Sequence, residues 1–321
     1  MKIKSLVLAA AALICAGTAV YAQGDRGLSG SVEYIKALNA KWQGPWLDDG
    51  RPNVPDDMIA RLKNVAIEDA WAELMKLGYV NQYEGDWMLV HEDENAAMCG
   101  RVFTAQFMPA RPDYLDAIVD QCIKDGLEIK QKRTVSVALN SLRKGDVYVA
   151  DTYNKEWLGT VVGSNLGRGV YNATGNGLIT NGHVRDVEGL RKIEGFNAWT
   201  KGYDPSYMRE TILTNFNVPI RMGKVTVIPG DVVLAKWGAV LFIPAHLVEH
   251  IVLTAEFTAV ADDFATYAQN NKLLTPGQVD SVWDEKTNDM FRKWFKGYKK
   301  QHPEIKLTDE EIEKCLKGRN F

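Results

Sequence analysis

Two short polar segments in the middle of the chain constrain its fold more than any other feature. The first is Gly163-Ser164-Asn165-Leu166, and the second, Asn181-Gly182-His183-Val184-Arg185-Asp186, places Arg185 22 residues after Gly163. The first segment is interpreted as a loop of small residues whose backbone N–H groups can approach an anion, followed by a Gly-rich connection. The second adds an arginine, which can hold a carboxylate, and an aspartate, which can hold a divalent metal.

Strand and helix patterns alternate around the two segments. Strands are predicted at residues 100–105, 146–151 and 177–180, where short apolar runs follow turn residues. A helical pattern from Tyr114 to Val119 follows the first of these strands. The alternation predicts an α/β fold with the Arg-Asp pair at the carboxyl end of the third strand, where open sheets usually place ligands.

The residues after the Arg-Asp pair predict a short helix from Val187 to Ile193. Asp186 would then lie at the start of this helix, where its carboxylate can act as a cap if no metal is bound. Further along the chain, short strands and turns are predicted at residues 217–223, 225–231 and 239–244.

The two polar segments at this spacing resemble the signature of the class II pyruvate aldolases related to 4-hydroxy-4-methyl-2-oxoglutarate aldolase. The regulator of ribonuclease activity A, RraA, belongs to the same superfamily, which therefore contains both enzymes and a protein-binding relative. Three downstream elements are also similar to the family: an Asn-x-Pro strand from Asn217, a Pro-Gly-Asp turn at residues 229–231, and a strand ending at Pro244. The resemblance covers about residues 54–255.

The resemblance implies a fold, an assembly and a set of ligands. It implies a swivelling β/β/α RraA-like core that assembles as a homotrimer, with the site at a subunit boundary. Asp186 would hold Mg²⁺ or Mn²⁺, and Arg185 would bind the pyruvyl carboxylate or keto oxygen, while the backbone of residues 163–166 would grip the other end of the carboxylate. One carboxylate with several waters is an ordinary way to hold Mg²⁺, and the metal can stabilise an enolate as a Lewis acid.

Three positions depart from the family pattern. Ser164 replaces an acidic residue that can orient a metal-bound water, and a serine cannot act as a base near neutral pH. Lys236 stands where a carboxylate is expected before a small turn, which favours a more anionic substrate. His183 replaces an alanine and places an imidazole beside the site. The imidazole can supply the missing base or bind a substrate hydroxyl, and the alternative is a loop histidine that points at solvent or at a neighbouring subunit.

These residues lead to two functional hypotheses of different classes. The first is a metal-dependent lyase, of the aldolase or decarboxylase type, that uses Arg185 and His183 on a pyruvate-derived 4-hydroxy-2-oxo acid or a related sugar acid. The second is a non-catalytic module that binds a ligand or a protein, as the ribonuclease regulator does. A menaquinone methyltransferase is disfavoured, because no Gly-rich nucleotide loop follows a first strand to hold an S-adenosyl cofactor.

Residues 1–22 have the pattern of a cleavable secretory signal. Two lysines precede an apolar run from Leu6 to Val20, and Ala22 marks the cleavage point. The run is short and rich in alanine for a spanning helix, so a membrane anchor is the weaker alternative, and a lipoprotein signal at Cys15 is disfavoured because Ile14 precedes it. Cleavage predicts a periplasmic or secreted protein. It removes two lysines and no acidic residue, so the formal net charge changes from −3 to −5 and leaves no basic excess to attract nucleic acid.

The rest of the chain divides into an irregular arm at residues 23–53, the family domain at residues 54–255 and a helical extension at residues 256–321. Helices are predicted from Pro55 to Leu77 and from Ala245 to Ala268, and the second of them ends the core. We expect the arm to pack its aromatic side chains on the domain. The extension is expected to pack its aromatic stripe within its own chain rather than on a neighbour.

Cysteines and the remaining histidines give weaker signals. Three cysteines remain after signal cleavage, Cys99, Cys122 and Cys315. Buried free thiols are preferred over one disulfide, because a chain of this length can bury an adequate core without one. His246 and His250 could share a helix face, but a pair without a third ligand is weak evidence for a metal.

Overall fold

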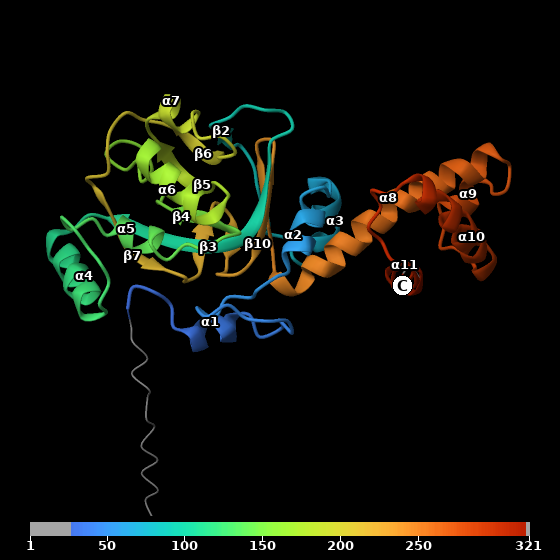
Figure 1. Ribbon diagram of the computed structural model, residues 1–321, viewed down its shortest axis with the longest axis horizontal. Coiled ribbons are helices and arrows are strands. Elements are labelled where there is room, and N and C mark those ends of the chain that lie inside the picture. The colour runs from blue at the N-terminus through green and yellow to red at the C-terminus, as the bar shows by residue number, and fades with distance from the viewer. Residues whose placement is uncertain (1–26, 319–321) are drawn as a thin grey trace, which may run out of the picture.

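A computed structural model of the protein describes residues 27–318, so the expected signal at residues 1–22 lies outside the described part. Its centre is a nine-stranded sheet, accompanied by a separate two-stranded hairpin (Figure 1). The strands of the large sheet are β1 (Tyr83–Glu84), β2 (Met88–Leu89), β3 (Ala97–Pro109), β4 (Asp146–Asp151), β5 (Leu178–Val184), β6 (Ala198–Tyr203), β7 (Thr211–Phe216), β10 (Val232–Lys236) and β11 (Ala239–Ile243). The hairpin consists of β8 (Ile220–Met222) and β9 (Val225–Val227).

Parallel strands form the middle of the large sheet. The strand order is β1-β11-β10-β3-β4-β5-β6-β2, with β7 paired to β3, and β3, β4, β5 and β6 run parallel to one another. Five of the six residues of β4 are buried, which explains why a continuous apolar run predicted this strand with its observed bounds. The predicted α/β class is confirmed.

Strand β5 is longer than the sequence predicted. It continues past Thr180 to Val184, with an irregular register against β6 between Thr180 and His183. Most of the second polar segment is therefore strand. Arg185 and Asp186 follow directly, so the pair does lie at the carboxyl end of a parallel strand, as expected.

Four helices pack on one face of the sheet: α4 (Pro112–Lys124), α5 (Val135–Leu139), α6 (Ser164–Thr174) and α7 (Val187–Leu190). The predicted loop at residues 163–166 is wrong, and so is the Gly-rich connection after it, because Ser164 begins α6. A Cβ at Gly167 would lie 2.4 Å from Leu190 Cδ2. Glycine thus allows α6 to pack closely on α7, and this packing overrides the low helix propensity of glycine.

The opposite face of the sheet is covered by the β8–β9 hairpin. Met222, Val225 and Val227 of the hairpin belong to the same buried cluster as Val147 and Val149 of β4. Because both faces of the central strands are buried, the carboxyl ends of β4 and β5 are where the sheet meets solvent and can present a site.

The N-terminal part contains α1 (Val32–Leu38), α2 (Asp56–Leu62) and α3 (Ile67–Lys76). The arm at residues 23–53 is thus not wholly irregular, and the single helix expected from Pro55 to Leu77 is two helices. Arg51 holds the arm against β4 of the sheet. Its side chain is fully buried, and its two terminal nitrogens donate to the carboxylate oxygens of Asp146 at 2.8 and 3.0 Å. A bidentate pair of this kind fixes orientation as well as position.

The C-terminal part is helical, as predicted. It consists of the 3₁₀ turn η1 (Ala245–Leu247), α8 (Val248–Asn270), α9 (Pro276–Val279), α10 (Glu285–Gln301) and α11 (Asp309–Gly318). The first half of α8 packs with α2 and α3 over the β10–β11 end of the sheet. The second half of α8 extends away from the sheet (Figure 1). Helices α10 and α11 pack against α8 in an apolar cluster that includes Phe257, Phe264 and Phe291. The aromatic stripe therefore packs within the chain, as expected.

Between residues 27 and 318, none of the helices combines the length and the apolar character needed to span a bilayer.

Candidate functional site

Gly163 brings the two polar segments of the sequence into contact. It is the N-cap residue of α6 and has no side chain of its own to cap the helix. A Cβ at this position would lie 2.4 Å from Asp186 Oδ2 and 2.7 Å from Arg185 Nη1. Any larger residue would displace both side chains, so glycine is what allows the pair to approach the helix.

Arg185 and Asp186 form a partly exposed ion pair at the start of α6. Arg185 Nη1 lies 2.6 Å from Asp186 Oδ2, and the two side chains are 30% and 44% exposed. The Ser164 amide donates to the same Oδ2 at 3.3 Å, and the Arg185 amide donates to the Val162 carbonyl at 3.1 Å. These contacts hold the pair against the first turn of α6 and leave it accessible from solvent.

The backbone at Asp186 is left-handed, with a φ of 58°. Asp186 is the N-cap residue of α7, but its side chain makes no capping hydrogen bond to that helix. The predicted capping role is therefore wrong. The carboxylate is turned towards Arg185 and Ser164 instead, and so belongs to the site at α6.

The electrostatics of the site favour an anion. The amides of the first turn of α6 carry the partial positive charge of a helix N-terminus, and Arg185 adds a full charge that Asp186, 2.6 Å away, offsets in part. Arg185 Nε is buried and has no hydrogen-bond partner within residues 27–318. A buried donor without an acceptor costs free energy, and an anionic oxygen bound beside it would remove that cost.

Residues 64–241 match the RraA-like family, described as Aldolase/RraA. The chain belongs to this family. The matched region is more than half of the chain and contains Gly163, Arg185 and Asp186. Helices α8 to α11 lie beyond the matched residues.

Solved structures share the RraA-like fold. RraAS2 of Streptomyces coelicolor, described as an unusual member of the RNase ES inhibitor RraA protein family, is 24% identical with a TM-score of 0.54, and the match covers 72% of this chain and all of RraAS2. An uncharacterised protein from Pseudomonas syringae pv. tomato is 17% identical with a TM-score of 0.53, and the match covers 74% of this chain and 98% of that protein. At these identities the likeness establishes the fold alone.

Ser164 of the RraA-like core is held close to α7. A Cβ at Gly189 would lie 2.6 Å from Ser164 Cβ and 3.1 Å from its Oγ. Gly189 therefore makes room for Ser164, and the sequence did not indicate this, since a single glycine in a four-residue helix carries no signal. The hydroxyl can orient a water molecule but cannot take its proton near neutral pH.

Asp186 is the protein ligand that the site offers to a cation. Its Oδ2 is engaged by Arg185 and Ser164, and no described residue donates a hydrogen bond to its Oδ1. In the part of the chain that the structure describes, no three His, Cys, Asp or Glu side chains are arranged to hold a metal ion. This donor set fits a hard cation such as Mg²⁺ or Mn²⁺ that keeps several waters and takes one carboxylate.

His183 lines a pocket that includes neither Arg185 nor Asp186. The pocket has a volume of about 310 Å³ and is lined by Glu84, Asn154, Glu156, Asn181, His183, Lys201 and Gly223. His183 Nδ1 is buried there without a hydrogen-bond partner among the described residues. Of the sequence-derived site residues, the structure thus brings Gly163, Ser164, Arg185 and Asp186 into contact, whereas His183 lines a pocket that none of them lines.

The other singled-out polar side chains have partners outside the site. Lys236 Nζ donates to the Val65 carbonyl at 2.7 Å. His246 Nε2 lies 3.3 Å from Tyr79 Oη, whereas His250 Nε2 lies 2.9 Å from Glu73 Oε1. The two histidines therefore have separate partners rather than a shared ligand position.

All three cysteines of residues 27–318 are free thiols. Cys99 and Cys122 are buried, as expected, and Cys315 is partly buried. Burial raises the pKa of the Cys99 thiol to about 12 and that of Cys315 to about 11. Such thiols stay protonated and are poor nucleophiles.

Proposed function

We propose that Arg185, Asp186 and the first turn of α6 bind the carboxylate and keto oxygens of a 2-oxo acid together with one divalent cation. On this proposal the protein is a carbon–carbon lyase of the aldolase or decarboxylase type, acting on a pyruvate-derived 4-hydroxy-2-oxo acid or a related sugar acid. The observation that carries it is the convergence of the pair on the N-terminus of α6, where Asp186 accepts from the Ser164 amide and the pair leaves no room for a Cβ at Gly163.

Each residue of the site would have a distinct task. The amides of Asn165 and Leu166 and the guanidinium of Arg185 would hold the carboxylate and fix the plane of the keto acid. Asp186 would hold Mg²⁺ or Mn²⁺, which supplies Lewis-acid stabilisation of the enolate when bound. Ser164 would orient a water molecule. His183 lines a pocket that does not include the pair, so it would serve for proton transfer or for binding a substrate hydroxyl only at the far end of a substrate that reaches from Arg185 into that pocket; its unpartnered Nδ1 is the supporting observation.

The test is pyruvate release from 4-hydroxy-2-oxo acids and from oxaloacetate, with and without Mg²⁺. We expect Arg185→Ala and Asp186→Ala to lower kcat/KM by about 100-fold or more, the usual effect of removing a group that binds developing negative charge. Arg168→Ala is the matched control, since Arg168 is an exposed arginine of the same helix. Equal, negligible rates for the wild type and Arg185→Ala would rule out aldolase activity on these substrates.

A second candidate is a non-catalytic binding module on the same fold. The observation that favours it is the 2.6 Å contact between Arg185 and Asp186, which lets the two charges satisfy one another. RraAS2, described as a member of an RNase ES inhibitor family, provides a precedent of that class. Calorimetric binding of pyruvate that depends on Arg185 but leads to no turnover would support the module over the lyase.

The proposal includes a location and an assembly. The pattern of residues 1–22 supports cleavage after Ala22 and a periplasmic or secreted enzyme. The partly exposed position of Arg185 and Asp186 supports a homotrimer in which a neighbouring subunit closes the site. The acidic balance of the chain supports a small-molecule partner rather than nucleic acid.

A further inference from the structure

A large cleft lies between α3 and the turn that joins β10 to β11. Its volume is about 750 Å³, within the range of small-ligand sites. Its lining includes Trp71, Tyr83 and Trp237 as aromatic side chains, together with three charged side chains, Glu68, Asp86 and Lys224. No residue of the Arg185–Asp186 site lines it, so the cleft is a second candidate site.

Two indole rings in this cleft are left in contact with solvent. Trp71 is 41% exposed and Trp237 is 61% exposed. Large aromatic side chains gain free energy when buried, so two exposed indoles that line one cavity are unfavourable in the free protein. A ligand that covers them would recover this free energy.

Trp237 also stands at a strained backbone position. Lys236 pairs with Ala239 across the hairpin, which leaves Trp237 and Gly238 as a two-residue turn. The φ of Trp237 is 56°. The first position of such a turn favours Gly, Asn or Asp, and a tryptophan there has no evident benefit for folding. Strain of this kind is typical of residues that clamp a ligand.

The charged groups of the cleft indicate the class of ligand. Glu68 and Asp86 can accept hydrogen bonds, and Lys224 can donate them. Lys224 Nζ already lies 5.6 Å from the centroid of the Tyr83 ring, which leaves less attraction for a cationic ligand. Flat indole faces beside hydrogen-bond donors and acceptors suit a sugar ring. The C–H groups of the ring stack on indoles, and its hydroxyls form hydrogen bonds. We propose that this cleft binds a neutral saccharide through Trp71 and Trp237.

The experiment is calorimetric titration of the full-length protein with cellotetraose, xylotetraose and maltotetraose, followed in parallel by tryptophan fluorescence. We expect saturable binding of at least one of them. Trp237→Asn should weaken that binding about tenfold or more, the effect of losing one aromatic stacking contact. The same variant should keep or raise the thermal midpoint, because asparagine tolerates the left-handed turn.

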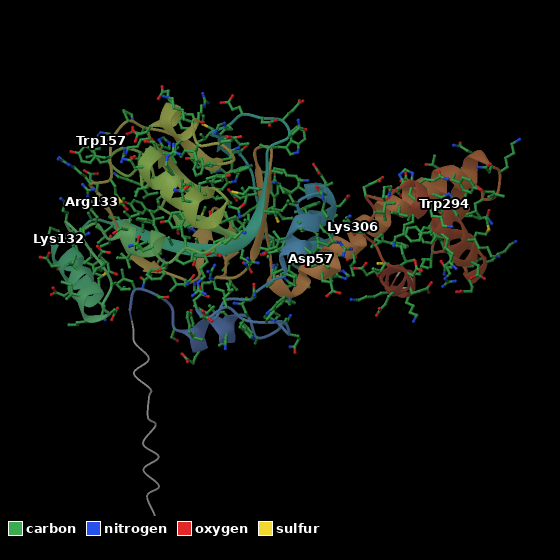
Figure 2. The ribbon with its side chains drawn as sticks, in the orientation of Figure 1. Asp57, Lys132, Arg133, Trp157, Trp294 and Lys306 are labelled. Atoms are coloured by element: carbon green, nitrogen blue, oxygen red, sulfur yellow. The ribbon has the colours of Figure 1, made fainter. Side chains whose placement is uncertain are left out.

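Trp157→Ala is the matched control. Trp157, labelled in Figure 2, is 60% exposed and lies in the loop after β4, outside the cleft. The Trp157→Ala variant should bind the saccharide like the wild type. Arg185→Ala should do so as well, because Arg185 does not line the cleft and the saccharide proposal does not rest on the Arg185–Asp186 site.

Several results would overturn the saccharide proposal. It fails if none of the three oligosaccharides binds the wild type, or if Trp157→Ala loses as much affinity as Trp237→Asn. Binding of tetramethylammonium in place of the sugars would assign the cleft to a cation. Dissociation of an oligomer by Trp237→Asn would assign the indoles to a subunit interface.

Discussion

Asp231 shows how burial alone changes the chemistry of a residue. It lies in the Pro-Gly-Asp turn before β10 and is 3% exposed. Burial raises its pKa to about 7, although the Ile228 amide donates to its Oδ2 at 2.9 Å and opposes the rise. The sequence identified this turn as a family element, but only the structure shows that its carboxyl group is desolvated.

This shift predicts a pH dependence of stability. The ordinary pKa of an aspartate in an unfolded chain is about 4, so the folded protein binds the proton of Asp231 more tightly. Its contribution is fully present below about pH 4 and is lost as the pH rises through about 7. Relative to Asp231→Asn, the wild type should lose about 2–3 kcal/mol of unfolding free energy between about pH 5 and about pH 8.

Denaturant unfolding of both proteins at the two pH values measures this difference. The variant cancels the contributions of all other titrating groups, because they are common to both proteins. A stability difference that is the same at both pH values would show that Asp231 titrates normally in the folded protein.

At the scale of elements, an arginine on α2 links the core to two helices of the C-terminal part. Arg61 donates to both carboxylate oxygens of Glu256 on α8, at 3.0 and 2.6 Å, and to Glu311 on α11 at 2.9 Å. Its side chain is 12% exposed, and the hydrogen bonds to Glu256 raise its pKa. Three helices that are far apart in the sequence therefore share one guanidinium.

We expect Arg61→Ala to loosen α11 from α8. Removing one partner of a largely buried, hydrogen-bonded charge cluster leaves two carboxylates without a counter-charge and should cost about 1–3 kcal/mol. Hydrogen exchange by mass spectrometry should show faster exchange in α11 and unchanged protection in β4 and β5.

Lys314→Ala is the control for this prediction. Lys314 also joins α11 to α8, through Glu249 at 2.7 Å, but both side chains are at least 60% exposed. Exposed pairs contribute at most about 1 kcal/mol. Equal exchange rates for the two variants would mean that the apolar cluster around Phe264 and Phe291, rather than Arg61, fixes the extension.

At the scale of the whole molecule, we predict a homotrimer. The two outermost strands of the sheet, β1 and β2, have two residues each, and such short edges are poor templates for pairing with another chain. Subunits should therefore meet through side chains rather than by extending the sheet. Multi-angle light scattering under native conditions should give three times the chain mass, and a monomer would contradict the prediction.

Local patterns were sufficient to predict several elements. The β4 strand at residues 146–151 was predicted with its bounds, because its two faces are buried and its sequence is continuously apolar. Helix α6 was missed, because Gly167 and Gly169 lower its local propensity. It forms because Gly167 packs on Leu190, a contact between residues that are adjacent only in the fold.

The structure of the two polar segments, residues 163–166 and 181–186, could be predicted only in part from the sequence. By itself, the sequence determined the family and the α/β class, while the roles expected of Gly163, Arg185 and Asp186 are implied by the resemblance and stay predictions. Only the tertiary structure decided that a helix begins at Ser164 and that His183 lines a pocket with Glu84 and Lys201. The physical reason is that a pocket is made of side chains from different strands, and their directions depend on register and backbone turns, such as the left-handed Asp186, that no local pattern encodes.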